Sequence, residues 1–155
     1  MTDITEGQTA PEFDLPTDGD GRVTLDSLKG QSVVLYFYPK ADTPGCTTEG
    51  LDFSALTEAF AAADTVVIGV SRDAVKKLDR FKAKHDLKVV LGSDEDGVVC
   101  EAYGTWIMKK LYGREYMGVE RATFLIDGAG VVRRVWRGVK VKGHAEQVLE
   151  AARSL

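Results

Sequence analysis

Cysteine is scarce in this sequence, and so are the features that mark membrane-spanning or nucleic-acid-binding proteins. Among 155 residues there are two cysteines, Cys46 and Cys100, which is too few for a disulfide framework. The longest apolar run, "SVVLYFYP", is far shorter than the roughly 20 residues that a membrane-spanning helix needs. The formal net charge is −4, whereas a nucleic-acid-binding surface needs an excess of basic residues. We therefore expect no membrane contact and no nucleic-acid partner.

Metal-binding spacings are also missing. The sequence has no CxxC, no paired-cysteine zinc spacing and no HExxH, and its two histidines, His85 and His144, stand apart without a ligand pattern. The segments "DGDG" and "DEDG" lack the acidic residue expected at the end of a calcium loop, so we interpret both as turns. We therefore expect no metal and no other cofactor.

The first residues, "MTDITEGQTAPEFDLP", have neither the basic segment nor the apolar core of a secretory signal. We therefore expect a cytoplasmic protein. In such a reducing compartment a cysteine is either an inert core residue or a reactive group.

The pattern of apolar residues predicts alternating strands and helices. Residues 13–30 alternate around "DGDG" as in a β-hairpin, and residues 73–87 form a helix for which Asp73 is a plausible N-cap. Residues 113–139 alternate around "DGAG" as two adjacent antiparallel strands. The remaining elements are strands at 32–39, 65–71 and 88–93 and helices at 47–62, near 98–104 and at 144–155.

This order of elements predicts one α/β domain over residues 1–155, with a mixed central β-sheet, helices on both faces and an N-terminal hairpin. Open sheets of this kind bind ligands at the carboxyl ends of their strands. Cys46 follows the strand at 32–39 and lies at the start of the next helix. It is therefore placed where a functional group is expected.

A cysteine at the start of a helix meets unpaired backbone N–H groups and the positive end of the helix dipole, so its thiol loses a proton more easily. Cys46 is thus a candidate nucleophile, although a small core residue is the simpler alternative. Thr43 can direct a hydroxyl at the same place, or it can serve only as a turn or cap residue. Pro39 and Pro44 fix the backbone on either side, and Pro39 could simply end its strand.

The segment "PKADTPGC" resembles the P-x-x-x-T-x-x-C motif of the peroxiredoxins, which are thiol peroxidases with a thioredoxin-like fold. The longer segment "FYPKADTPGCTTE" is similar to the subgroup called bacterioferritin comigratory protein or peroxiredoxin Q. "SDEDGVVCEAYGTW" and "RATFLID" resemble the second half of the same family, so that nearly the whole chain is covered.

The resemblance implies a role for each of five residues. Cys46 matches the peroxidatic cysteine, whose thiolate attacks the hydroperoxide and becomes a sulfenic acid. Thr43 matches the threonine that bonds the thiolate and the peroxide, and Pro39 the proline that shields them. Arg121 matches the arginine that binds both sulfur and peroxide oxygen, although an arginine in this position alone would be taken for a surface charge. Glu49 matches a carboxylate that holds this arginine, or it only complements the helix dipole.

The chain departs from the family in its second cysteine. Many members carry a resolving cysteine at the position of Leu51 or near that of Lys82, so the intramolecular disulfide step is not implied here. Cys100 lies on the predicted apolar face of a helix, which favours a core residue. We therefore expect a one-cysteine cycle, in which an external thiol reduces the sulfenic acid on Cys46. Exchange between two subunits through Cys100 is the alternative.

The sequence thus predicts a thiol-dependent peroxidase that reduces hydrogen peroxide and organic hydroperoxides, with thioredoxin or a low-molecular-weight thiol as donor. We expect a monomer rather than a homodimer. A peroxide sensor on the same scaffold, which does not turn over, is the alternative, and a disulfide reductase is disfavoured because no CxxC is present. The segment "WIMKKLYGREYMG" is expected to form loop and core packing, or else an exposed apolar patch near Cys46.

Overall fold

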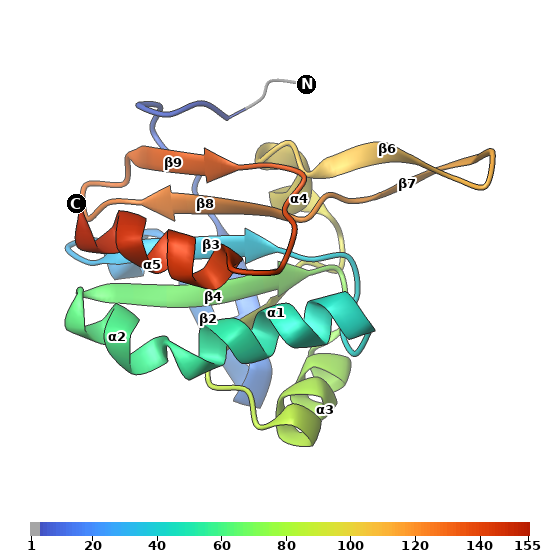
Figure 1. Ribbon diagram of the computed structural model, residues 1–155, viewed down its shortest axis with the longest axis horizontal. Helices are drawn as coiled ribbons and strands as arrows, with labels where there is room; N and C mark the ends of the chain where they lie inside the picture. The colour runs from blue at the N-terminus through green and yellow to red at the C-terminus, as the bar shows by residue number, and fades with distance from the viewer. Residues whose placement is uncertain (1–3) are drawn as a thin grey trace.

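The computed structural model describes residues 4–155 and has strands and helices in alternation (Figure 1). The strands are β1 Asp14–Thr17, β2 Gly21–Thr24, β3 Ser32–Phe37, β4 Thr65–Ser71, β5 Val90–Ser93, β6 Trp106–Leu111, β7 Arg114–Val119, β8 Ala122–Ile126 and β9 Val132–Trp136. The helices are α1 Pro44–Ala55, α2 Thr57–Ala62, α3 Val75–His85, α4 Val98–Ala102 and α5 His144–Arg153, with 3₁₀ turns η1 Asp18–Asp20 and η2 Asp26–Leu28.

In the described residues, seven strands form one mixed sheet in the order β2-β1-β5-β4-β3-β8-β9. The three inner strands β3, β4 and β5 run parallel, whereas β8 and β1 join them antiparallel. The hairpin predicted at the N-terminus is present as β1 and β2, and the strands predicted around "DGAG" are β8 and β9. The expected α/β fold with a mixed sheet is therefore confirmed.

The central strand β3 is buried on both faces because its side chains alternate between two separate cores. Val34 and Tyr36 belong to one core, together with buried residues of α1, α2, α3 and α5. Val33, Leu35 and Phe37 belong to the other, which is covered by α4 and the N-terminal segment. In Figure 1, α1, α2 and α5 accordingly lie across the near face of the sheet.

Three of the predicted elements differ in the structure. The helix expected at 47–62 begins at Pro44 and is interrupted at Leu56, where the Thr57 hydroxyl donates to the Ser54 carbonyl that a continuing helix would use. Asp73 is not an N-cap: Ala74 occupies that position without a capping side chain, and the Asp73 carboxylate accepts hydrogen bonds elsewhere.

The third difference is the segment "WIMKKLYGREYMG", for which the prediction of loop and core packing was wrong. It forms the antiparallel hairpin β6–β7, which projects from the sheet (Figure 1). Its turn residues Tyr112 and Gly113 both have positive φ, as a type I′ turn requires, but tyrosine is not a residue that such a turn favours. Five large side chains of the hairpin are exposed: Met108, Leu111, Tyr112, Tyr116 and Met117.

Among residues 4–155, no helix is long and apolar enough to cross a membrane.

Candidate active site around Cys46

Cys46 lies in the first turn of α1, just beyond the carboxyl end of β3. Thr43 is the N-cap residue and Pro44 the first helical residue, where its missing N–H costs nothing. The first intrahelical hydrogen bond runs from Thr47 to the Thr43 carbonyl, so the N–H groups of Gly45 and Cys46 point away from the helix as donors. The Cys46 residue is only 2% exposed. A charge that forms on this sulfur therefore faces oriented dipoles with little screening by water.

Arg121 joins Cys46 to Glu49. It precedes β8, and the antiparallel pairing of Phe37 with Ala122 brings it beside the end of β3. Its Nη2 donates to the Cys46 sulfur at 3.5 Å, and its Nη1 donates to Glu49 Oε1 at 2.7 Å. The guanidinium thus serves two acceptors at once, which a lysine ammonium could not do in this geometry.

Gly45 leaves room for this close approach. A Cβ on Gly45 would lie 3.1 Å from Arg121 Nη2, which is tighter than normal packing. A Cβ at position 45 would therefore require the guanidinium to shift by a few tenths of an ångström.

Glu49 is 1% exposed, and its Oε2 has no hydrogen-bond partner among the described residues. Burial raises the pKa of the Glu49 carboxyl to about 7, although the Arg121 cation opposes the shift. Burial alone would lower the pKa of Arg121, but Glu49 and Cys46 outweigh it and raise that pKa. Glu49 is therefore a buried partner of Arg121, and it lies beyond the first helical turn where the helix dipole would act on it.

The other two predicted site residues, Pro39 and Thr43, lie in the loop between β3 and α1. The Thr43 hydroxyl donates to the Lys40 carbonyl at 2.8 Å, so in this state its proton is directed to the backbone and not to the sulfur. Pro39 lies on the wall of a groove of about 510 Å³ between the active-site loop and the β6–β7 hairpin, with Trp106, Lys109 and Tyr116 among the other lining residues.

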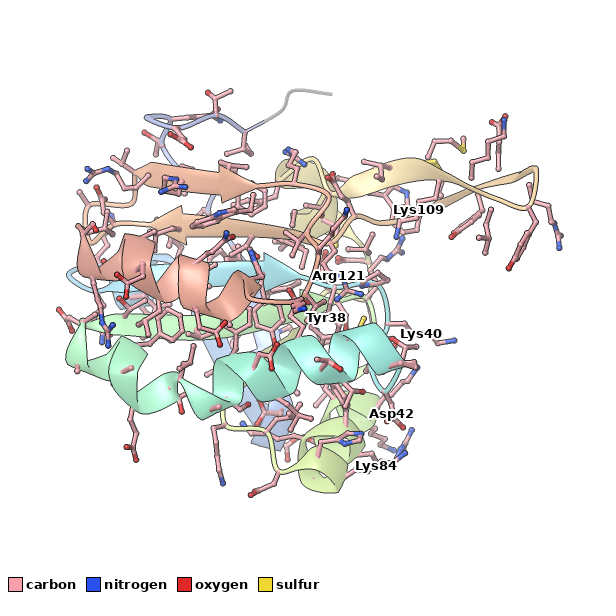
Figure 2. All side chains as sticks on the ribbon, in the orientation of Figure 1. Tyr38, Lys40, Asp42, Lys84, Lys109 and Arg121 are labelled. Carbon is pink, nitrogen blue, oxygen red and sulfur yellow. The ribbon has the colours of Figure 1, made fainter. Side chains whose placement is uncertain are left out.

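Lys109 was not identified from the sequence. It lies on β6, where Figure 2 labels it on the projecting hairpin, and its charge interacts with Arg121 and Cys46. Partial burial and the Arg121 cation lower the pKa of Lys109, and Cys46 opposes this shift. The β6–β7 hairpin alone brings Lys109 toward the Cys46 site, and no local sequence motif indicates this position.

The Cys46 site and the fold agree with comparisons to known proteins. The family model described as AhpC/TSA family matches residues 6–135. Peroxiredoxin Bcp of Bacillus subtilis is 47% identical over 98% of this chain and 97% of its own length. This chain is a peroxiredoxin of the AhpC/TSA family, in the Bcp or peroxiredoxin Q subgroup.

Solved structures show the same fold. The bacterioferritin comigratory protein of Xanthomonas campestris superposes with a TM-score of 0.87 at 45% identity, covering 92% of this chain and 90% of that chain. The peroxiredoxin Q of Xylella fastidiosa, solved as a cysteine-to-serine mutant, superposes with a TM-score of 0.94 at 39% identity. The match covers 99% of this chain and 98% of that chain. The thioredoxin-like peroxiredoxin fold is thereby confirmed, and the protein is a thiol-dependent peroxidase.

Cys100, the second thiol of this peroxiredoxin, lies in the other core. It is 0% exposed in the α4 core, so the central sheet separates it from Cys46. Burial and then the Asp94 carboxylate raise the pKa of the Cys100 thiol, which keeps it protonated. Its backbone N–H donates to Asp94 Oδ2 at 2.7 Å. These surroundings are those of an inert core cysteine.

The described residues contain no group of three or more His, Cys, Asp or Glu side chains placed to hold a metal ion. His144 is buried and contacts the Thr123 hydroxyl at 2.8 Å through Nε2. His85 Nε2 lies 2.8 Å from Asp42 Oδ1. Both histidines thus take part in contacts within the fold.

Proposed function

We propose that Cys46 is the peroxidatic cysteine and that it works in a one-cysteine cycle. The observation that carries this proposal is the position of the Arg121 guanidinium, which donates to Glu49 and to the sulfur of Cys46 in the first turn of α1. The Cys46 thiolate attacks one oxygen of the hydroperoxide, an S–O bond forms as the O–O bond breaks, and the departing alkoxide or hydroxide takes a proton from water. The products are a Cys46 sulfenic acid and an alcohol or water.

Arg121 and the backbone donors promote this step because negative charge moves from sulfur to the departing oxygen. Fixed donors directed at both positions stabilise the transition state more than the ground state. Thr43 and Pro39 complete the proposed site. When the Thr43 hydroxyl turns away from the Lys40 carbonyl, it can donate a hydrogen bond to the peroxide or accept one from it. Pro39 limits the access of water. We propose alkyl hydroperoxides as well as hydrogen peroxide as substrates. Alkyl peroxide reduction is ascribed to the Xanthomonas protein, and the groove beside Pro39 has partly apolar walls.

The second half of the cycle is proposed to use an external thiol. Two donor thiols reduce the sulfenic acid to the Cys46 thiol, with formation of one donor disulfide and one water. The burial of Cys100 in the opposite core supports this cycle over one that uses Cys100. Thioredoxin or a low-molecular-weight thiol as donor, a monomeric state and one domain over residues 1–155 stay predictions.

Stopped-flow mixing with hydrogen peroxide and with an alkyl hydroperoxide tests the proposal. Trp106, which lines the groove beside Pro39, provides a fluorescence signal, and quenched samples can be followed by intact mass. We expect Cys46 to be oxidised at about 10⁴ M⁻¹s⁻¹ or faster, as enzymes achieve. Cys46→Ser should abolish the reaction, and Cys100→Ser should leave both this rate and turnover with a thiol donor unchanged.

Loss of turnover in Cys100→Ser would refute the one-cysteine cycle. Consumption of a single peroxide equivalent without turnover under any reductant would favour a sensor instead. With scarce reductant we expect Cys46 to reach the sulfinic state, because no internal thiol competes for the sulfenic acid. An intact mass showing only a Cys46–Cys100 disulfide would contradict this.

A further inference from the structure

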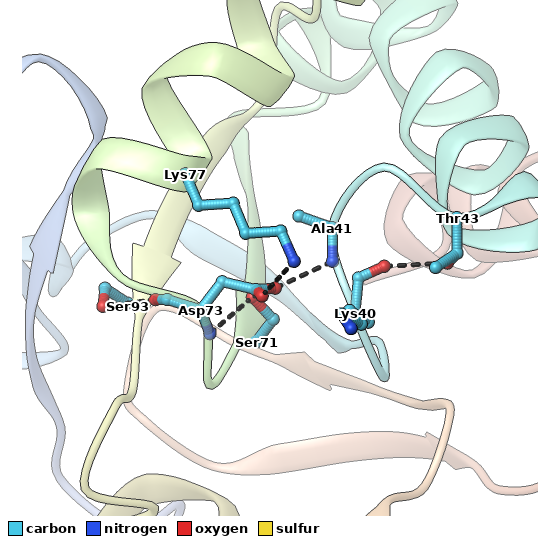
Figure 3. A network of polar contacts seen from close by, with 7 residues as sticks. All are labelled: Lys40, Ala41, Thr43, Ser71, Asp73, Lys77 and Ser93. Carbon is cyan, nitrogen blue, oxygen red and sulfur yellow. Dashed lines mark hydrogen bonds and ion pairs between the residues drawn. The ribbon is translucent and has the colours of Figure 1, made fainter.

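A buried polar network lies behind the loop that precedes Cys46. Its centre is the Asp73 carboxylate, which follows β4 and is 10% exposed. Oδ2 of Asp73 accepts hydrogen bonds from the Ala41 backbone N–H and from the Ser71 hydroxyl, both at 2.7 Å, and Oδ1 pairs with Lys77 Nζ at 3.1 Å. The Ser93 hydroxyl donates to the Asp73 carbonyl at 2.6 Å, so the residue is held on several sides (Figure 3).

The hydrogen bond to Ala41 connects two parts of the chain that meet only in the fold. Ala41 is 2% exposed and stands between Pro39 and Thr43, the two residues that flank the proposed peroxide position. Other contacts also hold the loop. Tyr38 N–H donates to the Val70 carbonyl, the Thr43 hydroxyl donates to the Lys40 carbonyl, and the Asp42 carboxylate contacts Lys84 and His85 of α3. The Ala41 bond holds the backbone in the middle of the loop, and Asp73 supplies it from the segment that follows the adjacent parallel strand β4.

We propose that Asp73 is a positioning residue for peroxide reduction, holding the loop from Pro39 to Thr43 against the N-terminus of α1 through its hydrogen bond to the Ala41 N–H. This inference rests on the proposed role of Cys46. Asp73 does not contact the sulfur. Its effect passes through the backbone of the loop to Thr43, the N-cap that fixes where the first N–H donors of α1 point.

Loss of this hydrogen bond should slow the reaction with peroxide more than the reaction with a simple alkylating agent. Iodoacetamide needs only an accessible thiolate, whereas peroxide needs donors placed at both the sulfur and the departing oxygen. Misplacement of such groups by about 1 Å can lower a rate about 100-fold. For Asp73→Ala we expect the ratio of the peroxide rate to the iodoacetamide rate to fall about 10- to 100-fold.

The chain offers a matched control in Asp18. Its carboxylate also accepts one backbone N–H, that of Leu91 at 2.9 Å, and also pairs with one lysine, Lys82 at 2.8 Å. Its exposed fraction, 15%, is close to the 10% of Asp73, but it holds β5 instead of the Cys46 loop. Asp18→Ala should lower the melting temperature in the same way and leave the ratio of the two rates within about twofold of the wild type.

The conservative variant Asp73→Asn should give partial rescue, since an amide oxygen can still accept the Ala41 N–H. The expected order of the rate ratio is wild type, then Asn, then Ala. If Asp73→Ala does not fold, Asp73→Asn and Ser71→Ala carry the test. Ser71→Ala removes the hydroxyl that donates to Asp73 Oδ2 and accepts the Asp73 N–H, while the carboxylate itself stays in place.

A ratio for folded Asp73 variants within about twofold of the wild type would overturn the positioning role, as would an equal loss in Asp18→Ala. Neither result would affect the role of Cys46. If instead the wild-type protein reacts with peroxide as slowly as a free thiol, the proposed function itself fails.

Discussion

Replacement of Arg121 by lysine is expected to slow peroxide reduction while the positive charge is kept. The guanidinium uses separate nitrogens for Glu49 Oε1 at 2.7 Å and the Cys46 sulfur at 3.5 Å. One ammonium can hold only one of these positions well, and the buried Glu49 carboxylate is the stronger acceptor. The sulfur then loses a charge-assisted hydrogen bond, which contributes about 1.5–3 kcal/mol. At 1.36 kcal/mol per tenfold change, the rate constant for peroxide should fall about 10- to 150-fold.

Arg121→Met removes the charge as well. Its effect on stability reports on the pairing of Arg121 with Glu49, whereas its effect on the peroxide rate reports on the hydrogen bond to Cys46. Removal of one partner of a buried pair costs about 3–5 kcal/mol where the other charge is retained. Glu49 can avoid part of this cost by staying protonated, because burial already raises its pKa to about 7. Without Arg121 that pKa rises further, so the folded form binds a proton that the unfolded form has released. The variant should therefore lose stability as the pH rises above about 4.5, and the loss should grow until the new pKa is reached.

Stopped-flow oxidation and urea unfolding at several pH values measure the two effects. The double variant Arg121→Met with Glu49→Gln should regain stability at neutral pH, since no buried carboxyl is left to ionise, but it should remain slow with peroxide. The reasoning is refuted if Arg121→Lys reacts within about twofold of the wild type. It is also refuted if the double variant recovers the wild-type rate, because the guanidinium would then act only through stability.

Three further changes test the packing and titration of the fold. Gly69→Ala should destabilise the protein by about 1–3 kcal/mol in urea unfolding, because its Cβ would lie 2.6 Å from Tyr36 Cζ in a fully packed core; wild-type stability would disprove this. Tyr112→Asn should raise the free energy of unfolding by a few tenths of a kcal/mol or more, because Tyr112 is 95% exposed and asparagine tolerates its φ of 51° far better. Burial lowers the pKa of His144 to about 4 from 6.5, so stability should fall as the pH drops through this window, by about 3 kcal/mol in total. His144→Gln, which can still bond Thr123, should remove that slope, and an unchanged slope would show that other groups cause it.

The main strands could be predicted because their patterns are local. The apolar runs of β3 and β4 and the alternation of β8 and β9 are visible in the sequence, and each became a strand of the main sheet. The position of Cys46 at a strand-to-helix junction was equally local. The hairpin β6–β7 was missed because its turn has Tyr112 where asparagine or aspartate would signal a type I′ turn.

The contacts between distant parts of the chain could not be predicted from local pattern. Arg121 lies 75 residues after Cys46, and the two meet only because β8 pairs antiparallel with β3. The family resemblance identified Arg121, whereas no resemblance in the sequence pointed to Lys109 or to the Ala41 bond of Asp73. Asp73 was misread as an N-cap because aspartate before a helix usually caps it, and only the position of Ala41 beside β4 shows which N–H its carboxylate accepts.

Two features of the chain argue against an intramolecular disulfide. The usual resolving-cysteine positions hold other residues, and the topology of the sheet separates Cys46 from Cys100. Successive residues of β3 face opposite cores, so the helix that carries Cys46 and the helix that carries Cys100 lie on opposite sides of the sheet. A disulfide needs the two Cα atoms within about 7 Å, and in the folded chain the sheet lies between the two cores that hold the sulfurs. Joining Cys46 and Cys100 of one chain would therefore require a rearrangement of this fold. In the proposed one-cysteine cycle, the lifetime of a sulfenic acid on Cys46 is therefore set by how fast thiols from outside the chain reach it.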